Sequence, residues 1–182
     1  MVAPRESIFS DAALLTSQDR ADSPWNRLAA QTPQPDPFCA TTIWQLAFRE
    51  AIDATRDVVV RRCEDGLIQF ARHRSATGLF VLGPIERLWL FGCNVLGSEG
   101  PQLLSGLLDD LRSAPDGLLP GVIVSGVEPN GMLASTLRRT FGDHHHINVF
   151  RAEMQCAASL DGGLDGFLVR RSAGHRRNLR RY

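Results

Sequence analysis

The sequence predicts an α/β (α+β) fold, in which a mixed β-sheet is flanked by helices. Residues that favour β-strands, at 58–62 and 67–72, flank Glu64-Asp65-Gly66. This tripeptide is typical of a hairpin turn because Asp-Gly readily adopts positive φ. The leucines of residues 101–111 recur at helical spacing. A four-strand meander followed by alternating helices and strands indicates a single mixed sheet with helical layers.

Two helices are expected before the first strand. Trp25 to Leu28 begin a short helix, which residues 32–37 end because they hold three prolines. Thr41 or Thr42 caps the second helix. Its apolar side chains repeat at helical spacing and are Ile43, Trp44, Ala47, Phe48 and Ile52.

The middle of the chain predicts a second turn and a longer helix. Runs at 79–82 and 88–91 read as strands on either side of Gly83-Pro84. Residues 92–100 form a loop, and Pro101 falls in the first turn of the next helix. The buried stripe of that helix consists of Leu103, Leu104, Leu107, Leu108 and Leu111.

Five further elements are expected toward the C-terminus. Residues 122–127 are apolar on both faces, as in a central strand. Residues 129–139 predict a short helix and 147–154 another strand. Residues 164–171 and 172–182 predict the last two helices.

Charge is distributed unevenly along a chain that is neutral overall. The chain of 182 residues is 43% hydrophobic and 22% charged, which is ordinary for a globular domain. Residues 170–182 carry six arginines and no acid, whereas the preceding residues carry 14 arginines against 20 acids. The body is therefore mildly acidic and the C-terminal tail strongly basic.

The sequence contains no lysine. Phosphate-loop ATP hydrolysis and pyridoxal chemistry both need one, so these functions are excluded. The cysteines, Cys39, Cys63, Cys93 and Cys156, include no close pair, which argues against zinc ribbons and redox dithiols. Without a secretory leader or a membrane span, the protein is expected to be cytoplasmic.

Two segments are candidate ligand sites. In an extended Asp143–His146, His144 and His146 would point the same way, but a catalytic zinc needs a third ligand, so no metal is expected. The glycines of residues 92–100 precede a helix and could cradle a phosphate. Glu99 would repel a phosphate, and a sharply turning loop is the favoured interpretation.

Aromatic residues at helical spacing are assigned to the core: Trp25, Phe38, Trp44 and Phe48.

A basic stripe lies in the last eleven residues. At 100° per residue, four arginines fall within a 140° arc of a helix: Arg176, Arg177, Arg180 and Arg181. Three interpretations are open for these arginines. They could be solvated near a helix end, contact phosphates of a nucleic acid, membrane or cofactor, or pair with acidic residues of a following segment. Solvation is the default, and these four are the candidate ligand-binding residues. Nucleic acid is not favoured, because only Tyr182 interleaves with them.

The C-terminal segment resembles one family. Ser172, Arg176, Leu179 and Arg180-Arg181 match the pattern Ser-x-x-x-Arg-x-x-Leu-Arg-Arg. This pattern is found in the cellulose-biosynthesis branch of the GNAT acetyltransferase superfamily, which is related to the Fem aminoacyltransferases. The looser matches upstream extend the resemblance over residues 23–182 and are Trp25–Leu28, Pro37-Phe38, Trp44, Asp65-Gly66 and Leu90-Phe-Gly92.

The resemblance implies a GNAT-like fold and acyl transfer to an amine, with acetyl-CoA or another acyl-CoA as co-substrate. Family members carry two related halves, and the acyl-CoA site lies mainly in the second. The chain is therefore expected to comprise a polar lead-in at 1–22, an incomplete N-terminal half-domain at 23–171, and a truncated basic helix at 172–182.

The superfamily motif for pyrophosphate is Arg/Gln-x-x-Gly-x-Gly/Ala. Residues 139–144 and 171–176 match it only as far as the glycine, so this chain is not expected to be catalytic alone. No catalytic base is assigned; His175 is conceivable, but a position on a helix surface is preferred. The alternatives are a non-catalytic interaction module that pairs with another chain or a second copy, and nucleic-acid binding through the arginine tail.

Overall fold

The computed structural model describes residues 23–52, 56–74, 80–113, 121–150, 162–170 and 172. The chain divides into two compact units, Met1–Val149 and Phe150–Tyr182. The described part of the first unit contains the sheet, four α-helices and a 3-10 turn, and the described part of the second contains one helix. The polar lead-in predicted at 1–22 lies outside the described residues.

The sheet is mixed and open, which confirms the predicted fold class. Its strands are β1 (Val58–Arg62), β2 (Gly66–Arg74), β3 (Phe80–Gly83), β4 (Val95–Gly97) and β5 (Gly121–Val122). β2 is central: β1 pairs with one edge, and β4 and β3 pair with successive parts of the other edge, all antiparallel. β5 pairs with β3 in parallel.

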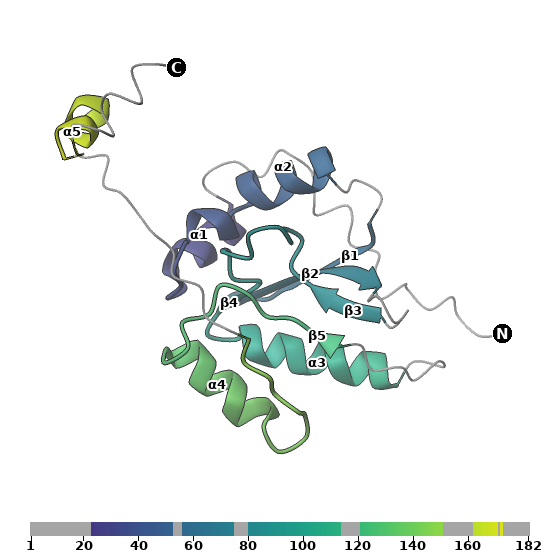
Figure 1. The fold of residues 1–182 in the computed structure, drawn as a ribbon. Helices are drawn as coiled ribbons and strands as arrows, with labels where there is room; N and C mark the ends of the chain where they lie inside the picture. Colours follow the sequence, from purple (N-terminus) through teal and green to yellow (C-terminus); the bar gives the residue numbers. More distant parts are fainter. Residues whose placement is uncertain are drawn as a thin grey trace. The chain divides into compact units, whose positions relative to one another are not determined.

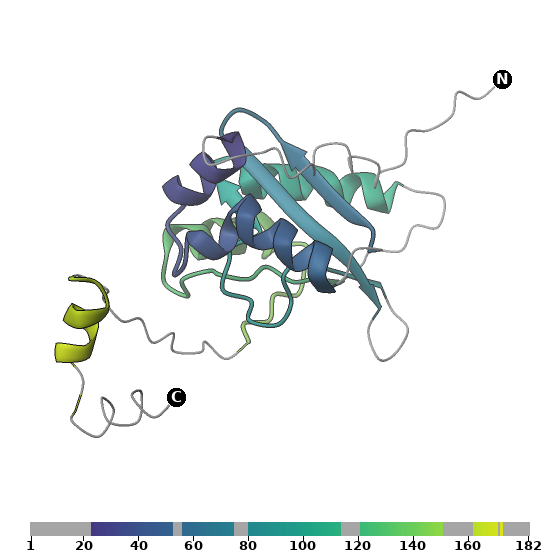
Figure 2. The ribbon, with the colours of Figure 1, turned by 90° about the horizontal axis from the view of Figure 1, so that it is seen from above.

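Helices cover both faces of the sheet. They are α1 (Pro24–Gln31), the 3-10 turn η2 (Phe38–Ala40), α2 (Thr42–Ile52), α3 (Gly100–Arg112) and α4 (Met132–Phe141). In Figure 1, α1 and α2 lie on one face, and α3 and α4 lie on the other. Figure 2 shows the same two layers from above, with α2 crossing over the strands.

Local signals explain where α1 begins and ends. The Ser23 side chain accepts a hydrogen bond from the N–H of Asn26 at 3.1 Å, and Pro24 occupies the first turn. Thr32 ends the helix by donating from both its backbone N–H and its hydroxyl to the carbonyl of Leu28. The predicted start and end of this helix are confirmed.

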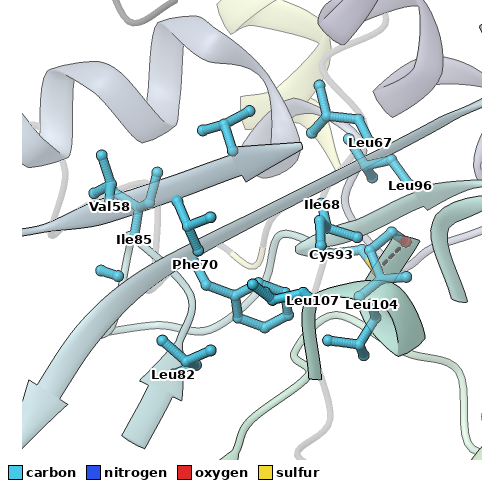
Figure 3. Close-up of a cluster of buried hydrophobic side chains, with 14 of the residues drawn as sticks. Val58, Leu67, Ile68, Phe70, Leu82, Ile85, Cys93, Leu96, Leu104 and Leu107 are labelled. Carbon is cyan, nitrogen blue, oxygen red and sulfur yellow. Dashed lines mark hydrogen bonds between the residues drawn. The ribbon is translucent and has the colours of Figure 1, made fainter. Parts of the chain in front are cut away.

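The core lies between β2 and α3. The side chains of Ile68 and Phe70 are fully buried, and Figure 3 shows the Phe70 ring directed toward Leu107. The predicted stripe of α3 is buried at Leu104, Leu107, Leu108 and Leu111. Each such side chain contributes about 1.5–3 kcal/mol through burial, so this contact contributes substantially to stability.

The β1–β2 hairpin forms as predicted, but for a different reason. Gly66 does not adopt positive φ. A Cβ atom at Gly66 would lie 2.8 Å from the backbone carbon of Glu99, and one at Gly97 only 2.1 Å from the carbonyl oxygen of Asp65. These glycines are required because β2, β4 and the start of α3 approach closely.

Two predicted strands are wrong. Residues 88–91 form an irregular loop, because the Glu86 carboxylate accepts hydrogen bonds from the N–H groups of residues 88–90. Residues 147–150, the described part of the strand predicted at 147–154, have no regular structure and are exposed. Apolar runs of this length do not by themselves form strands, since a strand also needs a pairing partner.

The central strand predicted at 122–127 is also wrong. Only Gly121 and Val122 pair, at the sheet edge beside β3. The next residues are held by Asn94, whose amide donates to the carbonyl of Ile123 and accepts from the N–H of Ser125, each at 3.0 Å. A fully buried side chain thus replaces the backbone ladder.

The buried face of α2 also differs from the prediction. Ile43 and Ile52 are each 56% exposed, whereas Gln45 is buried. Gln45 faces inward because its amide donates to the carbonyl of Cys39 at 2.6 Å and accepts from the N–H of Glu86 at 3.0 Å. A buried polar bridge therefore sets the orientation of this helix.

Candidate functional site

The predicted ligand-binding arginines lie outside the described residues. These are Arg176, Arg177, Arg180 and Arg181, and His175 lies there as well. The helix predicted at 164–171 is confirmed as α5 (Gly163–Val169). Ser172, the first residue of the family-like pattern, has no regular secondary structure.

The partial pyrophosphate match at residues 139–144 lies at the wrong end of a helix. Gly142 is the C-terminal cap of α4, and its N–H donates to the carbonyl of Arg138 at 2.8 Å. Phosphates bind at helix N-termini, where unpaired N–H groups and the positive end of the helix dipole face the ligand. This segment therefore provides no pyrophosphate cradle.

The glycine-rich segment at residues 92–100 is a structural loop that contains β4. Its N–H groups are used within the protein: that of Cys93 donates to Gln34 at 2.9 Å and that of Gly97 to Thr32 at 2.8 Å. The N–H of Glu99 donates to the carbonyl of Asp65 at 3.1 Å. The segment turns sharply at Gly97, where φ is +76°, but the prediction of a loop over all of residues 92–100 is wrong, because residues 95–97 pair with β2 as β4.

The histidine cluster does not form a metal site among the described residues, where no group of three potential ligands occurs. His144 and His145 lie in a turn, and both backbone N–H groups donate to the carbonyl of Phe141. The ring of His145 packs edge-on against Phe141 at 5.6 Å between centroids. The turn removes the extended geometry that would align His144 with His146.

The described residues present one contiguous apolar surface, which we call the aromatic face. Its side chains are Phe38, Ile43, Trp44, Leu88, Trp89 and Leu90, and all except half-buried Trp44 are between 41% and 59% exposed. The ring of Trp44 lies 5.7 Å from that of Phe38 and 5.4 Å from that of Trp89. Phe38 and Trp44 were predicted to be core, which is wrong; Trp25 and Phe48 are buried, as predicted.

A buried carboxylate shapes one side of the aromatic face. Glu86 is 1% exposed, and its side chain accepts hydrogen bonds from the N–H groups of Leu88, Trp89 and Leu90 at 2.5, 2.8 and 2.9 Å. Leu90 has a φ of +58°, which is rare for a residue with a Cβ. The three bonds to one carboxylate hold this unusual backbone and so fix where Trp89 lies.

The three cysteines among the described residues, Cys39, Cys63 and Cys93, are not activated nucleophiles; Cys156 lies outside the described residues. Burial raises the pKa of the Cys93 thiol to about 12. Burial also raises the pKa of Cys39 to about 12, aided by a hydrogen bond and the charge of Asp36 and by the charge of Glu86. A hydrogen bond to Glu99 is the main cause that raises the pKa of Cys63. Nucleophilic catalysis needs a thiolate, which these environments disfavour at neutral pH.

Stability is expected to fall at alkaline pH because of Cys93. The unfolded thiol loses its proton near its ordinary pKa of 9.0, while the folded thiol keeps it until about 12. Over this interval the unfolded state binds fewer protons at this thiol, so the free energy of unfolding falls by about 1.4 kcal/mol per pH unit.

Urea unfolding measured at several pH values above 9 tests this expectation. Because the chain has no lysine and one tyrosine, its four cysteines are prominent among the groups that titrate in this range, and a cysteine substitution isolates the share of one thiol. Cys93→Ala should show a shallower decline of stability with pH than the parent chain. Parallel declines in the two proteins would contradict the assignment.

No protein-family model, curated protein or solved structure matches the chain. Within the described parts of the chain, no helix combines the length and the apolar character that crossing a membrane requires.

Proposed function

We propose that the chain is the N-terminal half of a GNAT-type N-acyltransferase and is not catalytic alone. The observation that carries this proposal is the match of Ser172, Arg176, Leu179 and Arg180-Arg181 to the family pattern. The mixed sheet between two helical layers is compatible with such a half-domain. The N–H groups of Cys93, Gly97 and Glu99 are bonded within the protein and so are not free to bind a pyrophosphate.

In a complete protein the reaction would transfer an acyl group from acetyl-CoA or another acyl-CoA to a small-molecule amine. Catalysis would rest on positioning the amine against the acyl carbonyl and on a base that removes the amine proton. The basic stripe at 176–181 would contact ligand phosphates. No described residue is assigned as the base. A cytoplasmic location belongs to the same proposal.

Calorimetry with acetyl-CoA tests the proposal on the 182-residue chain. We expect no heat of binding at micromolar concentrations, because the described glycine segments offer no phosphate cradle. Micromolar affinity would overturn the assignment as a non-catalytic half. The positive test is the genomic reading frame: it should continue past the Tyr182 codon, directly or after one frameshift, into a segment with the complete pyrophosphate motif. A continuation without that motif would contradict the proposal.

A second candidate function is a non-catalytic interaction module. The observation that favours it is the aromatic face, since contiguous exposed apolar surfaces of this kind mark protein interaction sites. This candidate needs neither acyl-CoA nor the basic stripe.

A further inference from the structure

We propose that the aromatic face is the contact through which two copies of this chain form a symmetric dimer. This inference rests on the second candidate function and is independent of acyl transfer, because every residue of the proposed contact lies in the first unit. Four observations support the dimer: the continuity of the aromatic face, its area, its rigidity and the net charge of the chain.

The face is continuous across three segments of the sequence. Ring contacts join η2 to α2 through Phe38 and Trp44, and join α2 to the 88–90 loop through Trp44 and Trp89. Ile43 adjoins Trp44 in α2, and Leu88 adjoins Trp89 in the loop. The exposed carbons therefore form one surface instead of scattered single residues, which are common on any protein.

The area of the face matches what a stable dimer needs. A large side chain offers about 200 Å², so the five exposed members present about 500 Å² of apolar surface. A standard interface buries about 800 Å² per partner, of which about 65% is apolar in homodimers. The face therefore supplies the apolar centre of one half of such an interface.

The face is held in place before any partner binds. The three hydrogen bonds to the buried Glu86 carboxylate fix the backbone that carries Leu88 and Trp89. Trp89 in turn contacts Trp44 on α2. Little loop ordering is then needed on association, so more of the burial energy appears as affinity.

A second copy fits this surface better than an arbitrary partner. Tryptophan side chains are frequent interface hot spots that pair with hot spots on the partner, and in a two-fold dimer each copy supplies the same set. The chain has a formal net charge of zero at pH 7, so the copies do not repel each other through net charge.

Sedimentation equilibrium of the full chain tests the proposal across protein concentrations from about 1 to 100 µM. We expect a monomer–dimer equilibrium with a dissociation constant of about 10 µM or below, as interfaces of this size show. Ile43→Glu and Leu88→Arg, made singly, should each weaken the dimer at least about tenfold, because each places a like charge from both copies in the contact.

The matched control is Met132→Glu. Met132 is 73% exposed and begins α4 on the other helical layer, much as Ile43 lies in the first turn of α2. This variant should dimerise like the parent chain. Circular dichroism of each variant verifies that the fold is intact.

Three outcomes would overturn the proposal. The parent chain could remain monomeric throughout the concentration range, which would leave the face to a different partner. A dimer unaffected by both Ile43→Glu and Leu88→Arg would use another surface. A dimer weakened equally by Met132→Glu would be responding to added charge in general.

Discussion

Glu86→Ala is expected to lower the free energy of unfolding by about 3–5 kcal/mol. The substitution removes one carboxylate and strands the N–H groups of Leu88, Trp89 and Leu90, which all donate to it. It also allows Leu90 to leave its φ of +58°, and relief of this strain, which costs about 1–2 kcal/mol, offsets only part of the loss. Urea unfolding monitored by circular dichroism measures the change.

Glu86→Gln separates hydrogen bonding from volume. The amide keeps the size of the carboxylate and one acceptor oxygen, so we expect a smaller loss of about 2–3 kcal/mol. Glu50→Ala is the control: Glu50 is exposed on α2, and its loss should change stability by less than about 0.5 kcal/mol. If Glu86→Ala were as mild as Glu50→Ala, the carboxylate would not be what holds the loop.

Helices with local signals could be predicted from the sequence. Ser23 and Pro24 mark the start of α1, and the regular leucine stripe of α3 matches the face that the structure buries. Both signals act within one or two helical turns, so no knowledge of the rest of the chain is needed. The β1–β2 hairpin was also predictable, because its two strands are separated by only a short turn in the sequence.

Long-range contacts explain the elements that could not be predicted. Residues 88–91 are as apolar as a strand, but a glutamate buried at position 86 takes their N–H groups. Residues 122–124 are as apolar as a strand, yet the Asn94 side chain bonds to the backbone of Ile123 and Ser125 in place of a pairing strand. A buried carboxylate or amide that bonds to backbone has no signature in hydrophobic periodicity.

The aromatic face could not be predicted from hydrophobic periodicity either. Periodicity places Phe38 and Trp44 on an apolar stripe but does not say whether that stripe faces the sheet or the solvent. The contact that defines the face, between Trp44 and Trp89, joins residues 45 positions apart. One signal in the sequence could have indicated the loop. Glu86 lies between Gly83-Pro84 and the apolar residues 88–91, and a carboxylate in that position can accept hydrogen bonds from the backbone N–H groups that follow it.

Gln69→Met is expected to raise the free energy of unfolding by about 1–2 kcal/mol. Gln69 lies at the centre of β2 with no exposed surface, and neither polar atom of its amide has a hydrogen-bond partner. Methionine has a similar length and flexibility but no polar atoms to desolvate. Removing an unsatisfied buried amide therefore removes a penalty while keeping most of the volume.

Gln45→Met is the matched variant and should act in the opposite direction, lowering stability by about 2–4 kcal/mol. Gln45 is equally buried, but its amide joins the carbonyl of Cys39 to the N–H of Glu86. Methionine would leave both backbone groups without a partner. The two substitutions are chemically identical, so a difference in sign isolates hydrogen-bond satisfaction from side-chain volume. Destabilisation of similar size in both variants would refute this account, because it would mean that packing at these sites outweighs the polar contacts.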